Sequence, residues 1–388
     1  MKKMIFIYFC FQSLILQAQK DKVYTSLKDA LKHSQEVYKL DLSYSKIKKI
    51  PDEISKLTNL EELNIAQNKI SFLPESIGKL THLTFIHASF NNLSRLPESI
   101  GNLTKLKILN VSHNNLVYLP NSVCYLQSLK ELDLSINKIV SLPDNFGLLT
   151  NLFWLELGNN RLSNLPESFN KLQKLEGLIL NINKFNVFPK IIKDLTVLKT
   201  LNLARNKISE IPSEIGEVTN LTRLDIQENG IKKISPNIKN LNMLHYLNLS
   251  YNPLLIIDES IGELTHLKDI ELSLLELSEF PNILFKMHNL ERINLGYNKL
   301  ATLPDNINKF SNLKEFFLYE NEIIVLPESI GELSNLNKID LSGNKLKNLP
   351  VSIIQLSNLK FINIERNKFI VLNSDQKKFI KKRDMETY

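Results

Sequence analysis

A single pattern of 23 residues repeats without interruption from Val37 almost to the end of the chain. Its first column is leucine in every occurrence except the first, and no insertion or deletion separates one of the fifteen occurrences from the next. A strict period of this length is the signature of a solenoid, in which each unit packs only against its neighbours and the array forms an extended surface. The period therefore limits the fold more tightly than any other feature of the sequence.

The consensus of one repeat is L-x-x-L-x-L-x-x-N-x-L-x-x-L-P-x-x-I-G-x-L-x-x, and residues 60–82 follow it with isoleucine at two of the leucine positions. This pattern resembles the leucine-rich repeat family, in the 23-residue class of plant-type and Ras-scaffold proteins, over residues 37–381. The resemblance implies an α/β fold, a right-handed solenoid with a concave parallel sheet of about fifteen strands. It also implies a convex side of irregular or 3-10 segments.

The residues themselves give physical reasons for the same architecture. Leu63 and Ile65 alternate with the polar Glu62 and Asn64, as expected of a short strand with one buried face. The asparagine of the ninth column has two donors and an acceptor for turn groups that a stack would bury unpaired. Proline in the fifteenth column fixes φ and lacks an N–H, which favours turns or 3-10 pieces on the opposite side.

The two ends of the chain depart from the repeat. Residues 1–18 have a basic start, an apolar stretch and a small residue at Ala18, which predicts a secretory signal peptide; a membrane anchor is the alternative. Residues 19–36 are expected to form a capping helix, with Ser26 as its N-cap and Asp29 three residues later. Residues 37–373 hold the fifteen repeats, the last one degenerate.

Residues 374–388 are expected to form a C-terminal capping helix and tail that begins at Ser374 and turns Phe379 and Ile380 inward. Its basic residues are best explained as a solvated helix face near a helix C-terminus, with contact to an anionic surface as the alternative. They are Lys377, Lys378, Lys381, Lys382 and Arg383.

Cysteine and charge restrict the cellular context. Without residues 1–18 the chain keeps one cysteine, Cys124, which excludes an intramolecular disulfide, and six other repeats have glycine in its column. We interpret it as a small packing residue. Cysteine-free ends resemble bacterial exported members of the family, so we expect a secreted, cell-surface or periplasmic protein, with a cytoplasmic scaffold as the alternative. The net charge of +7 is too modest to indicate nucleic-acid binding.

No catalytic constellation is present. The repeats leave no room for a separate catalytic domain, and the seven histidines show neither metal-ligand spacing nor a cysteine partner. We therefore expect no enzyme activity, no cofactor and no metal. An enzyme with an unrecognised site on the concave face is the rival interpretation.

The candidate ligand site lies on the concave face, to which repeat positions three, five, seven and eight should contribute. Apolar and aromatic residues interrupt its polar background in two clusters. The first, in repeats three to seven, comprises Phe85, His87, Phe90, Ile108, His113, Ile136, Trp154, Ile179 and Ile182. The second, in repeats ten to thirteen, comprises Tyr246, Tyr251, Leu274, Tyr297, Phe317 and Tyr319.

Two interpretations of these clusters remain open. Exposed aromatic clusters are typical of interaction surfaces, but side chains on parallel strands also pack against one another without any ligand. On the first interpretation the chain is a non-enzymatic, monomeric module that binds a protein or a glycan, for adhesion or for contact with a host or another cell. Its contact with a membrane is limited to the signal peptide.

Overall fold

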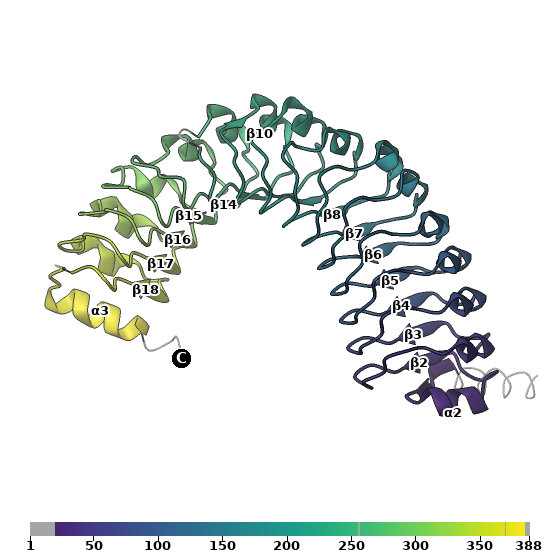
Figure 1. Cartoon of the computed structure of the whole chain (residues 1–388). Coiled ribbons are helices and arrows are strands. Elements are labelled where there is room, and N and C mark those ends of the chain that lie inside the picture. The colour runs from purple at the N-terminus through teal and green to yellow at the C-terminus, as the bar shows by residue number, and fades with distance from the viewer. Residues whose placement is uncertain (1–19, 255–256, 369, 385–388) are drawn as a thin grey trace, which may run out of the picture. The chain divides into compact units, whose positions relative to one another are not determined.

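A computed structural model describes residues 20–254, 257–368 and 370–384 (Figure 1). The predicted signal peptide, residues 1–18, lies outside the described residues. The chain divides into two compact units, residues 1–184 and 185–388. Each unit is built from the same 23-residue element: a three-residue strand, a turn, an extended segment and a short 3-10 helix.

Unit 1 begins with strand β1 (Val23–Tyr24) and helix α2 (Leu27–Lys32), followed by one strand for each repeat. These strands are β2 (Lys39–Asp41), β3 (Glu62–Asn64), β4 (Phe85–His87), β5 (Ile108–Asn110), β6 (Glu131–Asp133), β7 (Trp154–Glu156) and β8 (Gly177–Ile179). The 3-10 helices on the other side are η1 (Asp52–Lys56), η2 (Glu75–Lys79), η3 (Glu98–Asn102), η4 (Asn121–Tyr125), η5 (Phe146–Leu148) and η6 (Glu167–Lys171). The strands pair in parallel and in sequence order.

Unit 2 continues the pattern and ends in an α-helix. Its main strands are β9 (Thr200–Asn202), β11 (Arg223–Asp225), β13 (Tyr246–Asn248), β14 (Asp269–Glu271), β15 (Arg292–Asn294), β16 (Glu315–Phe317), β17 (Lys338–Asp340) and β18 (Phe361–Asn363). Its 3-10 helices are η7 (Lys190–Asp194), η8 (Ser213–Glu217), η9 (Pro236–Asn240), η10 (Glu259–Glu263), η11 (Asn282–Lys286), η12 (Ile307–Lys309), η13 (Glu328–Glu332) and η14 (Val351–Gln355). Strands β10 (Glu210–Ile211) and β12 (Lys233–Ile234) form a separate parallel pair, and α3 spans Ser374–Asp384.

The register of the sheet follows the repeat period. Glu62 of β3 faces Phe85 of β4, and Phe85 in turn faces Ile108 of β5, so partners are one repeat apart in sequence. The predicted parallel sheet with 3-10 segments opposite it is confirmed. Each repeat contributes one strand to it, and β1, which the sequence did not predict, adds a further strand beside β2.

Buried leucine and isoleucine columns form the core, and a ladder of asparagines joins the repeats. Asn137 is typical: its side-chain N–H groups donate to the carbonyls of Val111, Leu134 and Ser135 at 3.0–3.2 Å, and its Oδ1 accepts from the Leu116 N–H at 2.9 Å. The amide satisfies backbone groups of two successive repeats, as its donor and acceptor inventory predicts. The same column holds Asn68, Asn91, Asn114, Asn160, Asn183, Asn206, Asn229, Asn252, Asn298, Asn321, Asn344 and Asn367.

Polar side chains cap the terminal helices. The Ser26 hydroxyl accepts from the Asp29 N–H at 3.3 Å, as the sequence indicated for α2. Helix α3 begins at Ser374, as predicted, and its cap is Asn373, because the Asn373 Oδ1 accepts from the N–H groups two and three residues on, at 3.0 and 2.9 Å. Gln376 is only 3 % exposed and donates to the carbonyls of Leu349 and Pro350. It thereby satisfies backbone acceptors of the preceding repeat.

The inward face of α3 differs in part from the expectation. Ile380 is buried, but Phe379 is only half-buried, and the lysines of the helix are exposed. The side chain of Arg383 lies outside the described residues. Cys124 is fully buried, and burial raises the pKa of its thiol to about 11, which keeps it protonated and unreactive. Its assignment as a packing residue is therefore confirmed.

Candidate functional site: the open face of the sheet

The open face of each unit presents the side chains of strand positions three and five and of position eight, just after the strand. Position eight has a left-handed backbone in every repeat: φ lies between 50° and 57° in fourteen non-glycine residues and is 65° at Gly343. This conformation costs an ordinary L-residue about 1–2 kcal/mol, and it is most unusual for β-branched residues such as Ile136 and Ile182. Glycine would relieve the strain, yet the sequence keeps a side chain at this position in nearly every repeat.

Position five has a structural role that the sequence analysis missed. In ten repeats an aspartate or asparagine there accepts, through Oδ1, the N–H two residues further on, at 2.8–3.2 Å. These Asx turns shape the exit from the strand. Position seven is also constrained, since residues such as Ser89 and Ser112 are small and buried. Local structure therefore restricts the residues at both of these positions.

Five repeats lack this Asp or Asn at position five, and three of the replacements are predicted site residues: His87, Ile179 and Phe317. His87 instead makes a 2.7 Å hydrogen bond to the Ser89 hydroxyl, and burial lowers the pKa of its imidazole. The other two replacements, Glu156 and Glu271, direct their carboxylates to Trp154 and Arg292. The Asx-turn hydrogen bond is therefore absent at three residues of the proposed site, His87, Ile179 and Phe317.

The first cluster includes an exposed apolar column at position eight. Phe90 is 44 % exposed and Ile136 is 38 % exposed, and Phe90 stacks on His113 with a centroid distance of 3.8 Å and an interplanar angle of 16°. Ile182 belongs to the same column and is half-buried. We call Phe90, His113, Ile136 and Ile182 the apolar column of unit 1, although the polar Asn159 lies between its last two members. Phe90 therefore remains partly exposed although it stacks on His113.

Trp154 packs against the sheet. A Cβ added to Gly177, its register partner in β8, would lie 2.0 Å from the indole ring, so the ring covers that glycine. The indole N–H donates to Glu156 at 2.8 Å. Phe85, Ile108 and Ile179 are likewise half-buried strand residues, and Phe85 meets His87 edge-on at 6.2 Å. Packing within the sheet therefore accounts for the contacts of Trp154.

In the second cluster most aromatic rings already have partners. The Arg223 guanidinium lies 3.4 Å from the Tyr246 ring centroid. Tyr319 leans on Tyr297 edge-on at 5.3 Å and covers Gly296. Phe317 lies 4.9 Å from the guanidinium carbon of Arg292 and 5.2 Å from the Lys338 amine. Such cation–π contacts stabilise an exposed sheet without any ligand.

A charged network joins the neighbouring strands β14, β15 and β16. Arg292 pairs with Asp269 at 3.0 Å, with Glu315 at 3.1 Å and with Glu271. Burial raises the pKa of Asp269 despite the nearby Arg292, and it also raises that of Asp225, which is only 7 % exposed. The carboxylates of this face are therefore engaged or desolvated.

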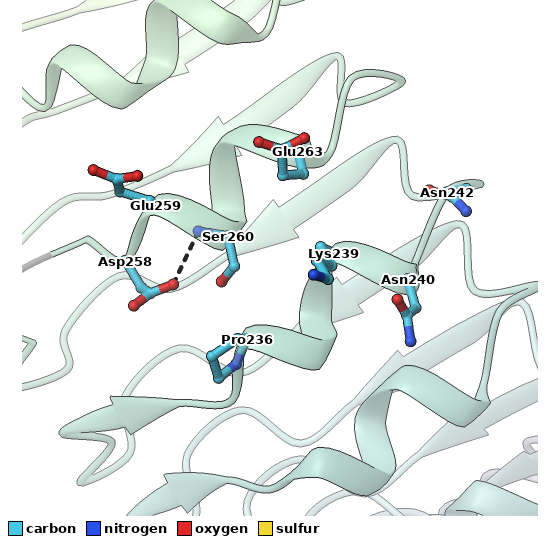
Figure 2. A pocket seen from close by; sticks show the side chains of 8 residues that line it. All are labelled: Pro236, Lys239, Asn240, Asn242, Asp258, Glu259, Ser260 and Glu263. Atoms are coloured by element: carbon cyan, nitrogen blue, oxygen red, sulfur yellow. Dashed lines mark hydrogen bonds between the residues drawn. The ribbon is translucent and has the colours of Figure 1, made fainter.

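Among the hollows of unit 2, two are relevant to ligand binding. One, of about 340 Å³, lies beside the exposed Tyr251 and Leu274 and is lined by Asn229, Tyr251, Asn252, Pro253, Leu274, Leu275 and Glu276. The other, of about 530 Å³, lies between η9 and η10. Figure 2 shows that its side chains come from these two neighbouring 3-10 helices and the residues that flank them, and that they do not converge on one point.

The substitutions of the consensus proline near this second hollow are explained by capping. The Asp258 carboxylate accepts the Ser260 N–H at 2.9 Å (Figure 2), and the Ser235 hydroxyl accepts the Asn237 N–H at 3.3 Å. Both side chains cap a 3-10 helix at the position that proline occupies before most of the other 3-10 helices. We therefore assign the irregular repeats of unit 2 a structural role at these two positions.

The part of the chain that the structure describes contains neither a metal-binding cluster nor a membrane-spanning helix. No group of three or more His, Cys, Asp or Glu side chains among these residues could hold a metal ion. No helix of the described ranges is long and apolar enough to cross a membrane.

The family follows from the sequence pattern and the fold together. The family model described as a leucine-rich repeat region matches residues 14–114, 77–152, 98–186, 122–227 and 186–300. The chain belongs to the leucine-rich repeat family. No curated protein sequence matches this leucine-rich repeat chain.

Several solved leucine-rich repeat structures resemble it. A leucine-rich repeat protein of Leptospira interrogans is 28% identical with a TM-score of 0.65, covering 93% of this chain and 98% of its own. A membrane receptor kinase ectodomain of Arabidopsis thaliana, solved in complex with Casparian strip integrity factor 2, is 25% identical with a TM-score of 0.59 over 89% of this chain and 49% of its own. The chain thus spans about half the length of that receptor fragment.

An internalin of Listeria monocytogenes is 24% identical, with a TM-score of 0.65 over 86% of this chain and 88% of its own. At this level of identity the likeness concerns the fold alone. It shows the same repeat architecture in a second bacterial protein.

Proposed function

We propose that this leucine-rich repeat protein is a non-enzymatic module that binds a protein or a glycan on the open face of unit 1. The observation that carries the proposal is the apolar column of Phe90, His113, Ile136 and Ile182. Its side chains stand on strained left-handed backbone, and two of them are more than a third exposed. Apolar side chains that are exposed to water and stand on strained backbone are typical of sites that a partner covers.

The two clusters are not equivalent candidates. In unit 2, Tyr246, Phe317 and Tyr319 have neighbouring cations or rings as partners, so packing accounts for them. Tyr251, Leu274 and Tyr297 remain exposed and form at most a secondary contact. In unit 1, Phe90 stacks on His113 but stays 44 % exposed, and Ile136 is 38 % exposed, so we place the main contact there.

The related structures support a binding role. The Arabidopsis receptor ectodomain was solved with a bound factor, and leucine-rich repeat folds are in general binding scaffolds. We further propose export, with adhesion or contact with a host or another cell as the biological role, on the strength of the signal-peptide pattern in residues 1–18. The second candidate is an intracellular scaffold. Mass spectrometry of the N-terminus of the native protein separates the two, because an intact Met1 would contradict export.

A photo-crosslinking experiment tests the binding site. A photoreactive phenylalanine analogue is placed at Phe90, and in a matched control at Tyr125, which is 56 % exposed but belongs to η4 on the other side of the repeat. Both proteins are exposed to intact material from the natural surroundings of the organism and irradiated. We expect a discrete adduct from the Phe90 position only. Adducts of equal yield from both positions, or an adduct from Tyr125 alone, would contradict the proposed site.

A further inference from the structure

The distribution of charge beside the open face differs sharply between the two units. We define the post-strand segment of a repeat as positions seven to fourteen, the eight residues between the end of the strand and the consensus proline. In unit 1 these segments contain no aspartate or glutamate at all. They contain eight cations, all of them exposed: Lys46, Lys48, Lys49, Lys69, Arg95, Lys138, Arg161 and Lys184.

In unit 2 the same segments are mixed in charge and internally paired. Lys299 pairs with Glu276 at 3.1 Å and Lys345 pairs with Glu322 at 2.8 Å. Arg205 pairs with Glu228, and Arg366 with Glu320, both at 2.5 Å. By contrast, none of the eight cations of unit 1 forms an ion pair with any residue that the structure describes. Ion pairs at these positions are thus compatible with the fold, but the post-strand segments of unit 1 lack the carboxylates that would form them.

The backbone holds three of these cations in a column. Lys138, Arg161 and Lys184 occupy position ten of consecutive repeats, and their N–H groups donate to the carbonyls of the preceding repeat at 2.8 Å each. Parallel strands lie about 4.8 Å apart, so the three side chains leave the backbone at about that spacing. Like charges so close repel one another, and a bound anion would relieve this repulsion.

The cationic column runs alongside the apolar column. Lys138 follows Ile136 by two residues, and Lys184 follows Ile182 by two residues, within the same turns. The structure therefore offers aliphatic contacts and unpaired positive charge side by side, at a repeat-to-repeat spacing fixed by the sheet. A ligand that uses both must combine apolar groups with negative charge.

We propose that this edge of unit 1 docks an acidic peptide segment whose apolar side chains contact the apolar column and whose carboxylates face Lys138, Arg161 and Lys184. The inference rests on the proposed function and names the chemistry of the partner. A polyanionic glycan would supply charge but no apolar side chain for Ile136 and Ile182. A single-stranded nucleic acid would favour aromatic platforms for its bases, whereas the cations here flank isoleucines.

The test compares two triple variants of the full chain that have the same change in net charge. The edge variant is Lys138→Glu, Arg161→Glu and Lys184→Glu. The control is Lys56→Glu, Lys79→Glu and Lys171→Glu, which are exposed residues in the last turns of η1, η2 and η6. Fluorescence anisotropy measures the binding of a labelled glutamate–tyrosine copolymer, with polyglutamate, dextran sulfate and polyuridine RNA as comparison probes.

We expect the wild type to bind the copolymer more tightly than polyglutamate, and all binding to weaken with added salt because exposed charges are screened. The edge variant should bind the copolymer about 100-fold more weakly, equivalent to about 2.8 kcal/mol, while the control changes little. Circular dichroism melts verify that both variants fold. Equal losses in the two variants, or tighter binding of dextran sulfate or RNA than of the copolymer by the wild type, would overturn the proposal.

The outcome is separable from that of the crosslinking experiment. If the edge variant keeps its affinity for the copolymer while the adduct at Phe90 still forms, the acidic-peptide assignment falls and the binding face stands. If the adduct at Phe90 does not form but the edge variant loses the copolymer, the cationic edge stands and the apolar column is not the binding site.

Discussion

Replacing Ile136 with glycine tests whether the apolar column exists for packing or for a partner. The side chain is 38 % exposed, and full burial of an isoleucine contributes about 1.5–3 kcal/mol, so its covered part contributes about 1–2 kcal/mol. Glycine adds an entropic cost of about 0.4–1 kcal/mol through the unfolded chain. Against these losses, glycine relieves the left-handed strain at φ 54°, a gain of about 1–2 kcal/mol.

These contributions nearly cancel, so Ile136→Gly should lower the free energy of unfolding by about 1 kcal/mol or less, a shift in Tm of under about 4 °C. The matched control is Leu132→Ala in β6 of the same repeat, where the side chain is 1 % exposed and truncation should cost about 2–5 kcal/mol. Differential scanning calorimetry and urea unfolding measure both. If Ile136→Gly destabilised the protein as much as Leu132→Ala, the column would be packing and the reasoning for a ligand would fail.

Three further predictions concern the sheet and its ladder. Gly177→Ala should displace the ring of Trp154, the only tryptophan of the chain, and shift its fluorescence. The control Gly230→Ala should leave the fluorescence unchanged, because a Cβ added there lies 3.5 Å from its nearest neighbouring atom. Equal spectra of the two variants would contradict the packing of Trp154 on Gly177. Asn137→Leu should leave buried backbone groups unpaired and lower the free energy of unfolding by about 2–4 kcal/mol, and a loss below that range in urea unfolding would weaken the ladder argument. Asp225→Asn should raise Tm at neutral pH. Burial raises the pKa of the Asp225 carboxyl, so stability is lost as pH rises through the folded-state pKa and the carboxyl ionises in the folded protein. That gain should vanish below the ordinary carboxyl pKa, and a Tm at neutral pH no higher than that of the wild type would contradict it.

The sequence predicted the periodic part of the molecule because each column has one physical task. Leu63 and its equivalents fill the core, and the ninth-column asparagine satisfies turn groups, so spacing alone gives the register: Trp154 and Gly177 are 23 residues apart in sequence and face each other across β7 and β8. The covering of Gly177 by the indole could have been read from that spacing. The start of α3 at Ser374 was predicted, whereas the capping role of Asn373 was not, although asparagine is a favoured N-cap residue.

Other features could not be read in this way. The left-handed backbone at position eight is hard to infer from the sequence, since among the fifteen residues only Gly343 and Asn159 are of types that adopt it readily. The aspartate and asparagine residues at position five look like surface residues selected for solubility, and only their hydrogen bonds identify them as Asx turns. The cationic edge was visible as a lack of carboxylates in the post-strand segments of unit 1, but its meaning depends on the ion pairs that unit 2 forms at the same positions.

The binding face is tested most directly by the affinity of the partner crosslinked at Phe90 for the wild type and for the double variant Phe90→Gly and Ile136→Gly, measured by isothermal titration calorimetry. Two exposed apolar anchors at the centre of a contact are worth about 2 kcal/mol or more each, so the account predicts a loss in affinity of about 100-fold or more with the fold retained. Unchanged affinity in a folded double variant would contradict the assignment of this face as the binding site.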